Sequence, residues 1–192
     1  MALDDHFFSL HTEEIARNLL CQYLCRETEE GLTSGLIVET EAYLSDHDPA
    51  CHASSGKTKR NATMFGPPAR AYIYFIYGNY FCFNVVTGPE GKGEAVLIRA
   101  VQPSEGLDLM LQRRGAQCSI NNLTSGPGKL CQAFAIDKTL DGYDLRQKPL
   151  YLKESKAEYD RMQVEATPRI GISSAQDKLL RFIISGNKYL SR

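Results

Sequence analysis

The sequence lacks the features that mark secreted and membrane-spanning proteins. Residues 1–6 have no basic flank and start no apolar run of signal-peptide length. No uncharged stretch in the 192 residues approaches the length of a membrane helix. We therefore expect a cytoplasmic protein. At this length we also expect one domain over residues 1–192, because the chain is too short for two ordinary hydrophobic cores.

The cysteines lack any CxxC pair, which is the usual first half of a structural zinc site. There are six: Cys21, Cys25, Cys51, Cys82, Cys118 and Cys131. Four lie in apolar runs, as reduced buried cysteines do, and without a secretion signal a disulfide framework is not expected. The adjacent pair Cys51-His52 does not easily supply two tetrahedral ligands. We expect no metal and no other cofactor.

A strong net charge is also missing, since the chain sums to −1. The charges are nevertheless unevenly distributed. Residues 1–50 hold 11 acids and 2 bases (−9), residues 51–150 hold 7 and 12 (+5), and residues 151–192 hold 5 and 8 (+3). An acidic segment followed by a basic body permits one basic face, and such a face could bind phosphates.

The pattern of elements favours an α+β fold with a largely antiparallel, curved sheet, flanking helices and a protruding β-hairpin. Helices are predicted for residues 12–24, 105–115 and 126–134. Strands are predicted for residues 36–44, 71–77, 80–87, 95–101 and 180–185. Gly78-Asn79 suits a two-residue hairpin turn. The polar turn 27–31 should end the first helix, and Pro103 should stop the fourth strand.

Glu39, Glu41 and Tyr43 share one face of the predicted strand 36–44, because side chains alternate along a strand. Two carboxylates at this spacing resemble a glycosidase pair, whereas one carboxylate suffices to activate a water. Charged residues are also routine on an exposed strand face. From the residues alone, either glutamate could be a general base, both could act together, or neither could be catalytic.

Arg99 and Asn84 interrupt apolar strands and need partners if they are buried. A carboxylate, with Glu41 as a candidate, would satisfy Arg99. A base edge or the backbone would satisfy Asn84.

Aromatic and basic side chains surround the predicted hairpin and the long loop 45–70. Tyr77 abuts the turn, where it could pack on the sheet or act as a wedge in a base stack. His52 could be a solvated loop residue or part of a stacking pocket. Lys57, Lys59, Arg60 and Arg70 could be solvated or could bind phosphates. A loop of this length is usually functional.

Several segments, in one order, resemble the alkyladenine (3-methyladenine) DNA glycosylase family. They are VETEAY at 38–43, His52, RN..MF at 60–65, YIYFIYGNYFCFN at 72–84, LIRAVQP at 97–103 and GPGKLCQAFAI at 126–136. The resemblance runs from about residue 8 to residue 190. It implies a monofunctional glycosylase of base excision repair that acts on double-stranded DNA as a monomer, associated with the nucleoid if bacterial. The substrates implied are alkylated or deaminated purines: 3-methyladenine, 7-methylguanine, hypoxanthine and ethenoadenine.

The same resemblance implies a role for individual residues. Glu41 would be the general base and Arg99 would help to hold the attacking water. The pocket for the flipped base would comprise Tyr43, His52, Tyr74, Asn84 and Ile170. The DNA contacts would come from Tyr77, Met64, Thr58, Lys59 and Arg60. The chain departs from the family at Asn79, where the best-known member has methionine, and in the length and charge of residues 53–59.

Other hypotheses make different use of these residues. A non-catalytic module that recognises damaged DNA would share Tyr77 and the basic loop but would not need Glu41 and Arg99. A small-glycoside hydrolase would need both Glu39 and Glu41. A thiol hydrolase based on Cys51-His52 is disfavoured, because adjacent side chains on an extended chain point apart.

Overall fold

The computed structural model describes residues 1–76, 80–115, 117–155 and 163–191. The tip of the predicted hairpin, with Tyr77 and Asn79, lies outside these residues. In the described part, no helix has the length and apolar character needed to cross a membrane.

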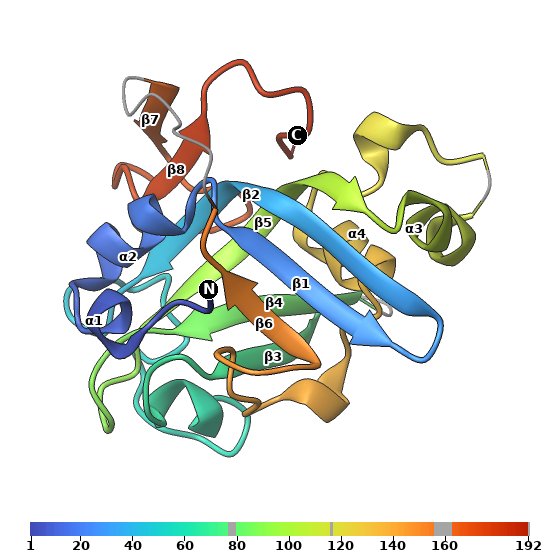
Figure 1. Cartoon of the computed structure of the whole chain (residues 1–192). Coiled ribbons are helices and arrows are strands. Elements are labelled where there is room, and N and C mark those ends of the chain that lie inside the picture. The colour runs from blue at the N-terminus through green and yellow to red at the C-terminus, as the bar shows by residue number, and fades with distance from the viewer. Residues whose placement is uncertain (77–79, 116, 156–162, 192) are drawn as a thin grey trace.

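One antiparallel sheet of eight strands organises the chain (Figure 1). Its order is β3-β4-β5-β2-β1-β6, with β8 paired to β2 and β7 paired to β8. The strands are β1 (Tyr23–Thr28), β2 (Gly31–Tyr43), β3 (Ala71–Ile76), β4 (Tyr80–Val86), β5 (Ala95–Glu105), β6 (Leu150–Lys153), β7 (Val164–Thr167) and β8 (Arg181–Ile184). This arrangement confirms the predicted α+β fold with a curved antiparallel sheet.

Short helices lie on either side of the sheet as seen in Figure 1. The α-helices are α1 (Asp5–Phe8), α2 (Thr12–Leu19), α3 (Leu107–Arg114) and α4 (Pro127–Ala133), and the 3-10 helices are η1 (Ala62–Phe65), η2 (Ile120–Asn122) and η3 (Lys138–Leu140). The apolar side of α2 is buried against β2 and β5. The predicted helices 105–115 and 126–134 are therefore confirmed with small changes at their ends.

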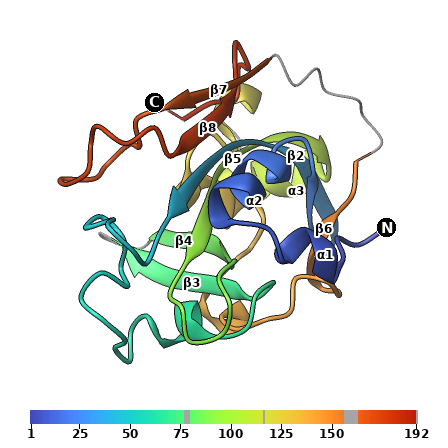
Figure 2. The ribbon, with the colours of Figure 1, turned by 90° about the vertical axis from the view of Figure 1, so that its left-hand side faces the viewer.

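Strand β2 is the central element for function, because three neighbours pair with it. Residues Gly31–Leu36 pair with β1, most of the remainder pairs with β5, and Glu39–Glu41 pair with β8 as well. The segment around Glu39 and Glu41 is thus enclosed on both edges. Figure 2 shows β7 and β8 at one end of the molecule and the β3–β4 hairpin at the other, with β2 and β5 between them.

Three predicted boundaries are wrong. The strand predicted to start at residue 36 starts at Gly31, because residues 31–36 pair with β1. The first helix ends at Leu19, not at the turn 27–31, because Cys21 adopts a left-handed conformation (φ 67°) and its amide bonds to the Ile37 carbonyl. Tyr23 and Leu24 therefore begin β1. Strand β5 continues through Pro103, because the β2–β5 register shifts between Ser34 and Gly35, opposite this proline. Such an irregularity tolerates a missing backbone donor.

Substitution of Gly106, which precedes α3, tests the close backbone packing between this residue and β2. It has φ of +74°, and a Cβ atom there would lie 2.3 Å from the Leu32 carbonyl oxygen. We expect Gly106→Ala to lower the free energy of unfolding by roughly 3 kcal/mol or more, from strain and overpacking together. Gly142→Ala is the matched control, since Gly142 has φ of +83° with open space around it. Its expected cost is about 1 kcal/mol. Equal urea midpoints for the two variants would contradict this account.

Candidate active site

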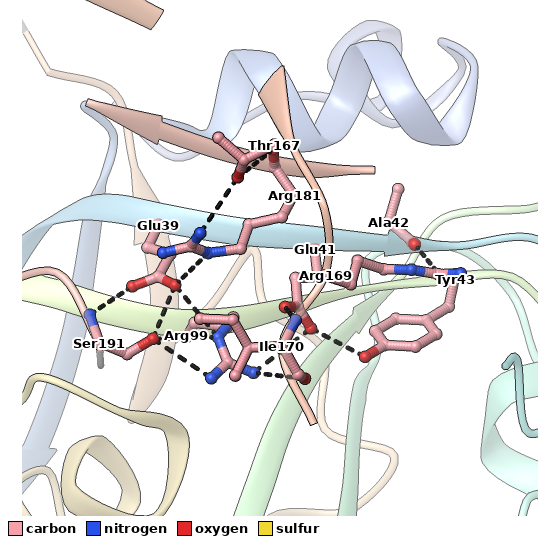
Figure 3. A network of polar contacts seen from close by, with 10 residues as sticks. All are labelled: Glu39, Glu41, Ala42, Tyr43, Arg99, Thr167, Arg169, Ile170, Arg181 and Ser191. Carbon is pink, nitrogen blue, oxygen red and sulfur yellow. Dashed lines mark hydrogen bonds and ion pairs between the residues drawn. The ribbon is translucent and has the colours of Figure 1, made fainter. Parts of the chain in front are cut away.

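Glu39 and Glu41 point from β2 into one buried polar network (Figure 3). Both side chains have 0% solvent exposure. The predicted strand face is confirmed, since both carboxylates contact the same arginine, Arg99. The interpretation as a solvated face is wrong, because both carboxylates are buried and the segments at Ile170 and Ser191 bind them directly.

The Glu39 carboxylate accepts four hydrogen bonds. One comes from Arg99 Nε at 3.1 Å and one from Arg181 Nε at 2.6 Å. Ser191 donates the other two, from its amide at 2.6 Å and its hydroxyl at 2.7 Å. A carboxylate offers about four acceptor positions. Three of these bonds end on Oε1 and the Ser191 amide binds Oε2, so two arginines and Ser191 hold Glu39.

The Glu41 carboxylate accepts three hydrogen bonds from the described residues. The Tyr43 hydroxyl donates to Oε2 at 2.8 Å, and Arg99 Nη1 lies 3.4 Å from the same oxygen. The Ile170 amide donates to Oε1 at 2.8 Å. By the same count, one acceptor position remains on Glu41, at Oε1. Glu39 and Glu41 thus differ in their donors, since among the described residues two arginines bind Glu39 and only one binds Glu41.

Arg99 reaches from β5 between the two carboxylates. Its Nη1 also lies 3.5 Å from the Ile170 carbonyl oxygen, and its Nε and Nη2 each lie 3.2 Å from the Ser191 hydroxyl. Burial alone would lower the pKa of Arg99, but Glu41 and Glu39 more than offset burial and raise it. The predicted carboxylate partner of Arg99 is confirmed.

A second buried ion pair, Arg169 with Asp48, lies beside Tyr43. Arg169 Nη1 and Nη2 bind Asp48 Oδ2 and Oδ1 at 2.7 and 2.6 Å, and Nη1 also binds the Ala42 carbonyl oxygen at 2.9 Å. The guanidinium carbon is 4.7 Å from the centroid of the Tyr43 ring. Burial and the Glu41 carboxylate raise the pKa of the Tyr43 phenol, so the hydroxyl remains a donor.

The aromatic residues expected in the pocket form a connected group. The rings of His52 and Tyr74 are 4.5 Å apart between centroids, in an edge-on arrangement. His52 Nδ1 lies 3.0 Å from the Tyr72 hydroxyl, with which it shares a hydrogen bond. Tyr43 and Tyr74 both pack against the smaller hydrophobic cluster, which contains Tyr72. The structure thus brings three of the predicted pocket residues, Tyr43, His52 and Tyr74, to one region.

The remaining predicted residues are placed as follows. Asn84 is buried, and its amide donates to the Tyr72 carbonyl at 3.0 Å, so the backbone is one of its partners. Ile170 lies at Glu41, as described above. Met64 is only 2% exposed and belongs to the smaller hydrophobic cluster. Because its side chain is in a core, its placement does not support the DNA contact expected of it.

The basic loop lies at the surface. Thr58, Lys59 and Arg60 are exposed, and the Thr58 amide and hydroxyl both donate to Asn61 Oδ1. Arg60 Nη2 donates to the Phe75 carbonyl at 3.2 Å, which connects the loop to the β3–β4 hairpin. Tyr77 lies outside the described residues. Within the described ranges, no group of three or more His, Cys, Asp or Glu side chains could hold a metal ion.

The sequence did not single out four residues of this network: Asp48, Arg169, Arg181 and Ser191. Asp48 resembles any acid of a polar loop, and Ser191 any terminal serine. Arg181 begins an apolar strand, which is the same signal that drew attention to Arg99. Arg169 carried a weaker signal, because it immediately precedes Ile170, which the family resemblance places in the base pocket.

Comparison with known proteins gives a consistent result. Residues 6–188 match the family model described as methylpurine-DNA glycosylase. A protein of Carboxydothermus hydrogenoformans and one of Methanoculleus marisnigri are each 49% identical to the chain, with complete coverage of both partners. A protein of Rhodopirellula baltica is 44% identical over 99% of this chain and 83% of its own length. All three bear the name "Putative 3-methyladenine DNA glycosylase".

Glu39→Gln tests the structural importance of the first carboxylate. The substitution removes the charge that Arg99 and Arg181 share, so we expect the free energy of unfolding to fall by about 3–5 kcal/mol. The measurement is urea denaturation. Asp46→Asn is the control, because Asp46 is an exposed partner of Lys92 and its loss should change stability little. A Glu39→Gln variant as stable as the control would contradict the network's importance.

The shifted pKa of His52 predicts how the stability of the protein changes with pH. His52 is exposed as a residue, but partial desolvation of its ring against the neighbouring tyrosines, with a smaller effect of Arg60, lowers the pKa of His52 below its ordinary value of 6.5. The unfolded chain then binds this proton more readily, so stability falls as the pH drops through 6.5 towards the lowered pKa. We expect urea midpoints at pH 7.5 and 5.5 to differ less in His52→Gln than in wild type. The exposed His6→Gln variant should keep the wild-type difference; the account fails if His52→Gln keeps it too.

Proposed function

The chain belongs to the methylpurine-DNA glycosylase family, and from that premise we propose how it acts: it flips a damaged purine out of duplex DNA and hydrolyses the N-glycosidic bond with a water activated by Glu41. The family and its relatives make the protein a DNA glycosylase of the 3-methyladenine type. The proposed substrates are 3-methyladenine, 7-methylguanine, hypoxanthine and ethenoadenine. The protein would act as a monomer on DNA and leave the phosphodiester backbone intact.

The observation that carries the proposal is the open acceptor position on Glu41. A water bound there would be near the Ile170 carbonyl oxygen and Arg99 Nη1, which lie 3.5 Å from each other. The carbonyl could accept one proton of the water, and Glu41 the other. Glu39 is instead held by two arginines and by two hydrogen bonds from Ser191. This difference favours Glu41 as the base and disfavours a mechanism that uses both glutamates.

The proposed hydrolysis proceeds by attack of the activated water on the deoxyribose. Glu41 takes a proton from the water, and the water oxygen forms a bond to C1′ of the deoxyribose. The C1′–N bond breaks, and its electron pair leaves with the base. An alkylated purine already carries a positive charge, so it departs as a neutral molecule without further protonation. The products are the free base and an abasic site. A neutral lesion such as hypoxanthine would need an additional proton, delivered to the base.

The aromatic group supports recognition of the flipped base. A cationic purine stacked on Tyr43 or Tyr74 would gain about 0.5–2 kcal/mol per ring from the ring quadrupole. His52 would present a hydrogen-bonding edge, and Asn84 would crowd the exocyclic amine of normal guanine. Extrusion costs a few kcal/mol, less for a damaged pair. In this proposal Tyr77 offsets part of that cost by filling the gap in the duplex.

The exposed loop would bind the backbone of the DNA. Lys59 and Arg60 offer positive charge to phosphates, and Thr58 offers a hydroxyl group. The contact from Arg60 to the Phe75 carbonyl keeps the loop beside the hairpin, so phosphate binding and insertion of the wedge would occur at the same place. The enzyme's affinity would then fall with increasing salt.

Glu41→Gln tests the proposed mechanism. The substitution keeps the shape of the side chain but removes the base, so we expect release of 7-methylguanine to slow by roughly 10²–10⁴-fold. The measurement is single-turnover release of the free base from a duplex with one lesion, with DNA affinity measured in parallel. Affinity should change little.

Lys59→Ala is the matched comparison for this test. It should weaken DNA binding without a comparable loss of the rate at saturating enzyme. Undiminished release by Glu41→Gln would contradict the assignment of the base. Binding by wild type without release of any base would contradict the proposed function.

A further inference from the structure

The Arg169–Asp48 pair covers one face of the Tyr43 ring and has no part in the mechanism above. Both side chains are 0% exposed. The guanidinium carbon lies 4.7 Å from the ring centroid, and Figure 3 shows the Arg169 side chain extending alongside Tyr43. Because the guanidinium occupies one face, a base that stacks on Tyr43 has only the opposite face available.

The same pair connects three segments of the site. Asp48 also accepts hydrogen bonds from the amides of Leu44 and Ala50, which fixes the start of the loop that carries His52. Arg169 binds the carbonyl of Ala42, the residue between Glu41 and Tyr43. It also immediately precedes Ile170, whose amide binds Glu41. The charge behind Tyr43 is therefore held in a fixed position.

We propose that Asp48 and Arg169 set the preference of the site between cationic and neutral purines. This inference rests on the proposed function and deepens it. The positive charge of Arg169 faces the ring and would repel a cationic base stacked on the other side. The bidentate carboxylate of Asp48 neutralises that charge. The pair thus lets Tyr43 accept a cationic purine, although an arginine lies against its other face.

The expected size of the effect follows from distance. A stacked base lies about 3.5 Å from the ring, so its charge would be roughly 8 Å from the guanidinium. At an effective dielectric constant of about 20, an unneutralised charge at that distance changes affinity by up to roughly 30-fold. Solvent at the open site reduces this value, and we expect a change of roughly 10-fold.

The experiment compares a cationic with a neutral lesion in three variants. The single-turnover rate of 7-methylguanine release is measured at a slightly acidic pH, where this base is cationic. Its ratio to the rate of hypoxanthine release under the same conditions is then compared between variants. Asp48→Asn leaves Arg169 unneutralised and should lower the ratio roughly 10-fold. Arg169→Gln leaves the Asp48 charge and should raise the ratio. The double variant should return the ratio to within about 2-fold of wild type.

A merely structural role would give a different pattern. Loss of packing or geometry lowers both rates together, and a second substitution does not rescue the first. Rescue of the 7-methylguanine rate of Asp48→Asn by Arg169→Gln should be visible without reference to hypoxanthine. If Asp48→Asn does not fold, Arg169→Gln carries the test: loss of the positive charge should raise the ratio, whereas a structural role leaves it at the wild-type value.

Asp144→Asn is the matched control, because Asp144 forms a similar bidentate pair with Arg146 elsewhere in the fold. Its ratio should equal that of wild type even if its stability falls. An unchanged ratio in Asp48→Asn and Arg169→Gln, with both lesions released by wild type, overturns this inference alone. Release of neither base by wild type overturns the proposed function, and this inference with it.

Discussion

Burial of the Glu39 and Glu41 carboxylates is the constraint on which the rest of the structure depends. Removing an ion from water costs several kcal/mol even after the protein relaxes, and these two lie on one strand, two residues apart. Arg99 contacts both of them, and Arg181 completes the charge balance at Glu39. With Asp48 and Arg169, the region holds three acids and three arginines. These charges come from segments far apart in sequence, so the site can form only when β2, β5 and β8 have come together.

The network divides the two carboxylates into different roles. Glu39 accepts four hydrogen bonds from three segments and acts as the anchor that orients Arg99. Glu41 receives fewer donors and retains a position for a water. A carboxylate in a dry site, held by fixed donors, needs little reorganisation when charge develops during a reaction. In this account, the buried anchor provides the rigidity on which the reactive carboxylate depends.

The sequence predicted those features that arise from local pattern. Alternation placed Glu39, Glu41 and Tyr43 on one face, and an apolar strand interrupted by a charge correctly marked Arg99 as buried and paired. Local pattern could not predict the end of the first helix, because the left-handed Cys21 and its bond to Ile37 depend on tertiary contact. It also could not distinguish Glu39 from Glu41. Their difference comes from Arg181, Ser191 and Ile170, about 130 to 150 residues later in the chain, and no spacing rule connects such distant residues. The burial of Met64 could not be predicted for a related reason, since only the fold reveals that η1 directs it into a core.

The most direct test of the central claim is a crystal structure of the protein bound to a duplex whose damaged nucleotide carries a 2′-fluorine, which slows cleavage of the glycosidic bond. The account predicts an ordered water within hydrogen-bond distance of Glu41 Oε1 and the Ile170 carbonyl oxygen, facing C1′ of a flipped nucleotide. The four donors to Glu39 should be unchanged. A water held by Glu39, or a flipped nucleotide whose C1′ faces away from Glu41, would contradict the account.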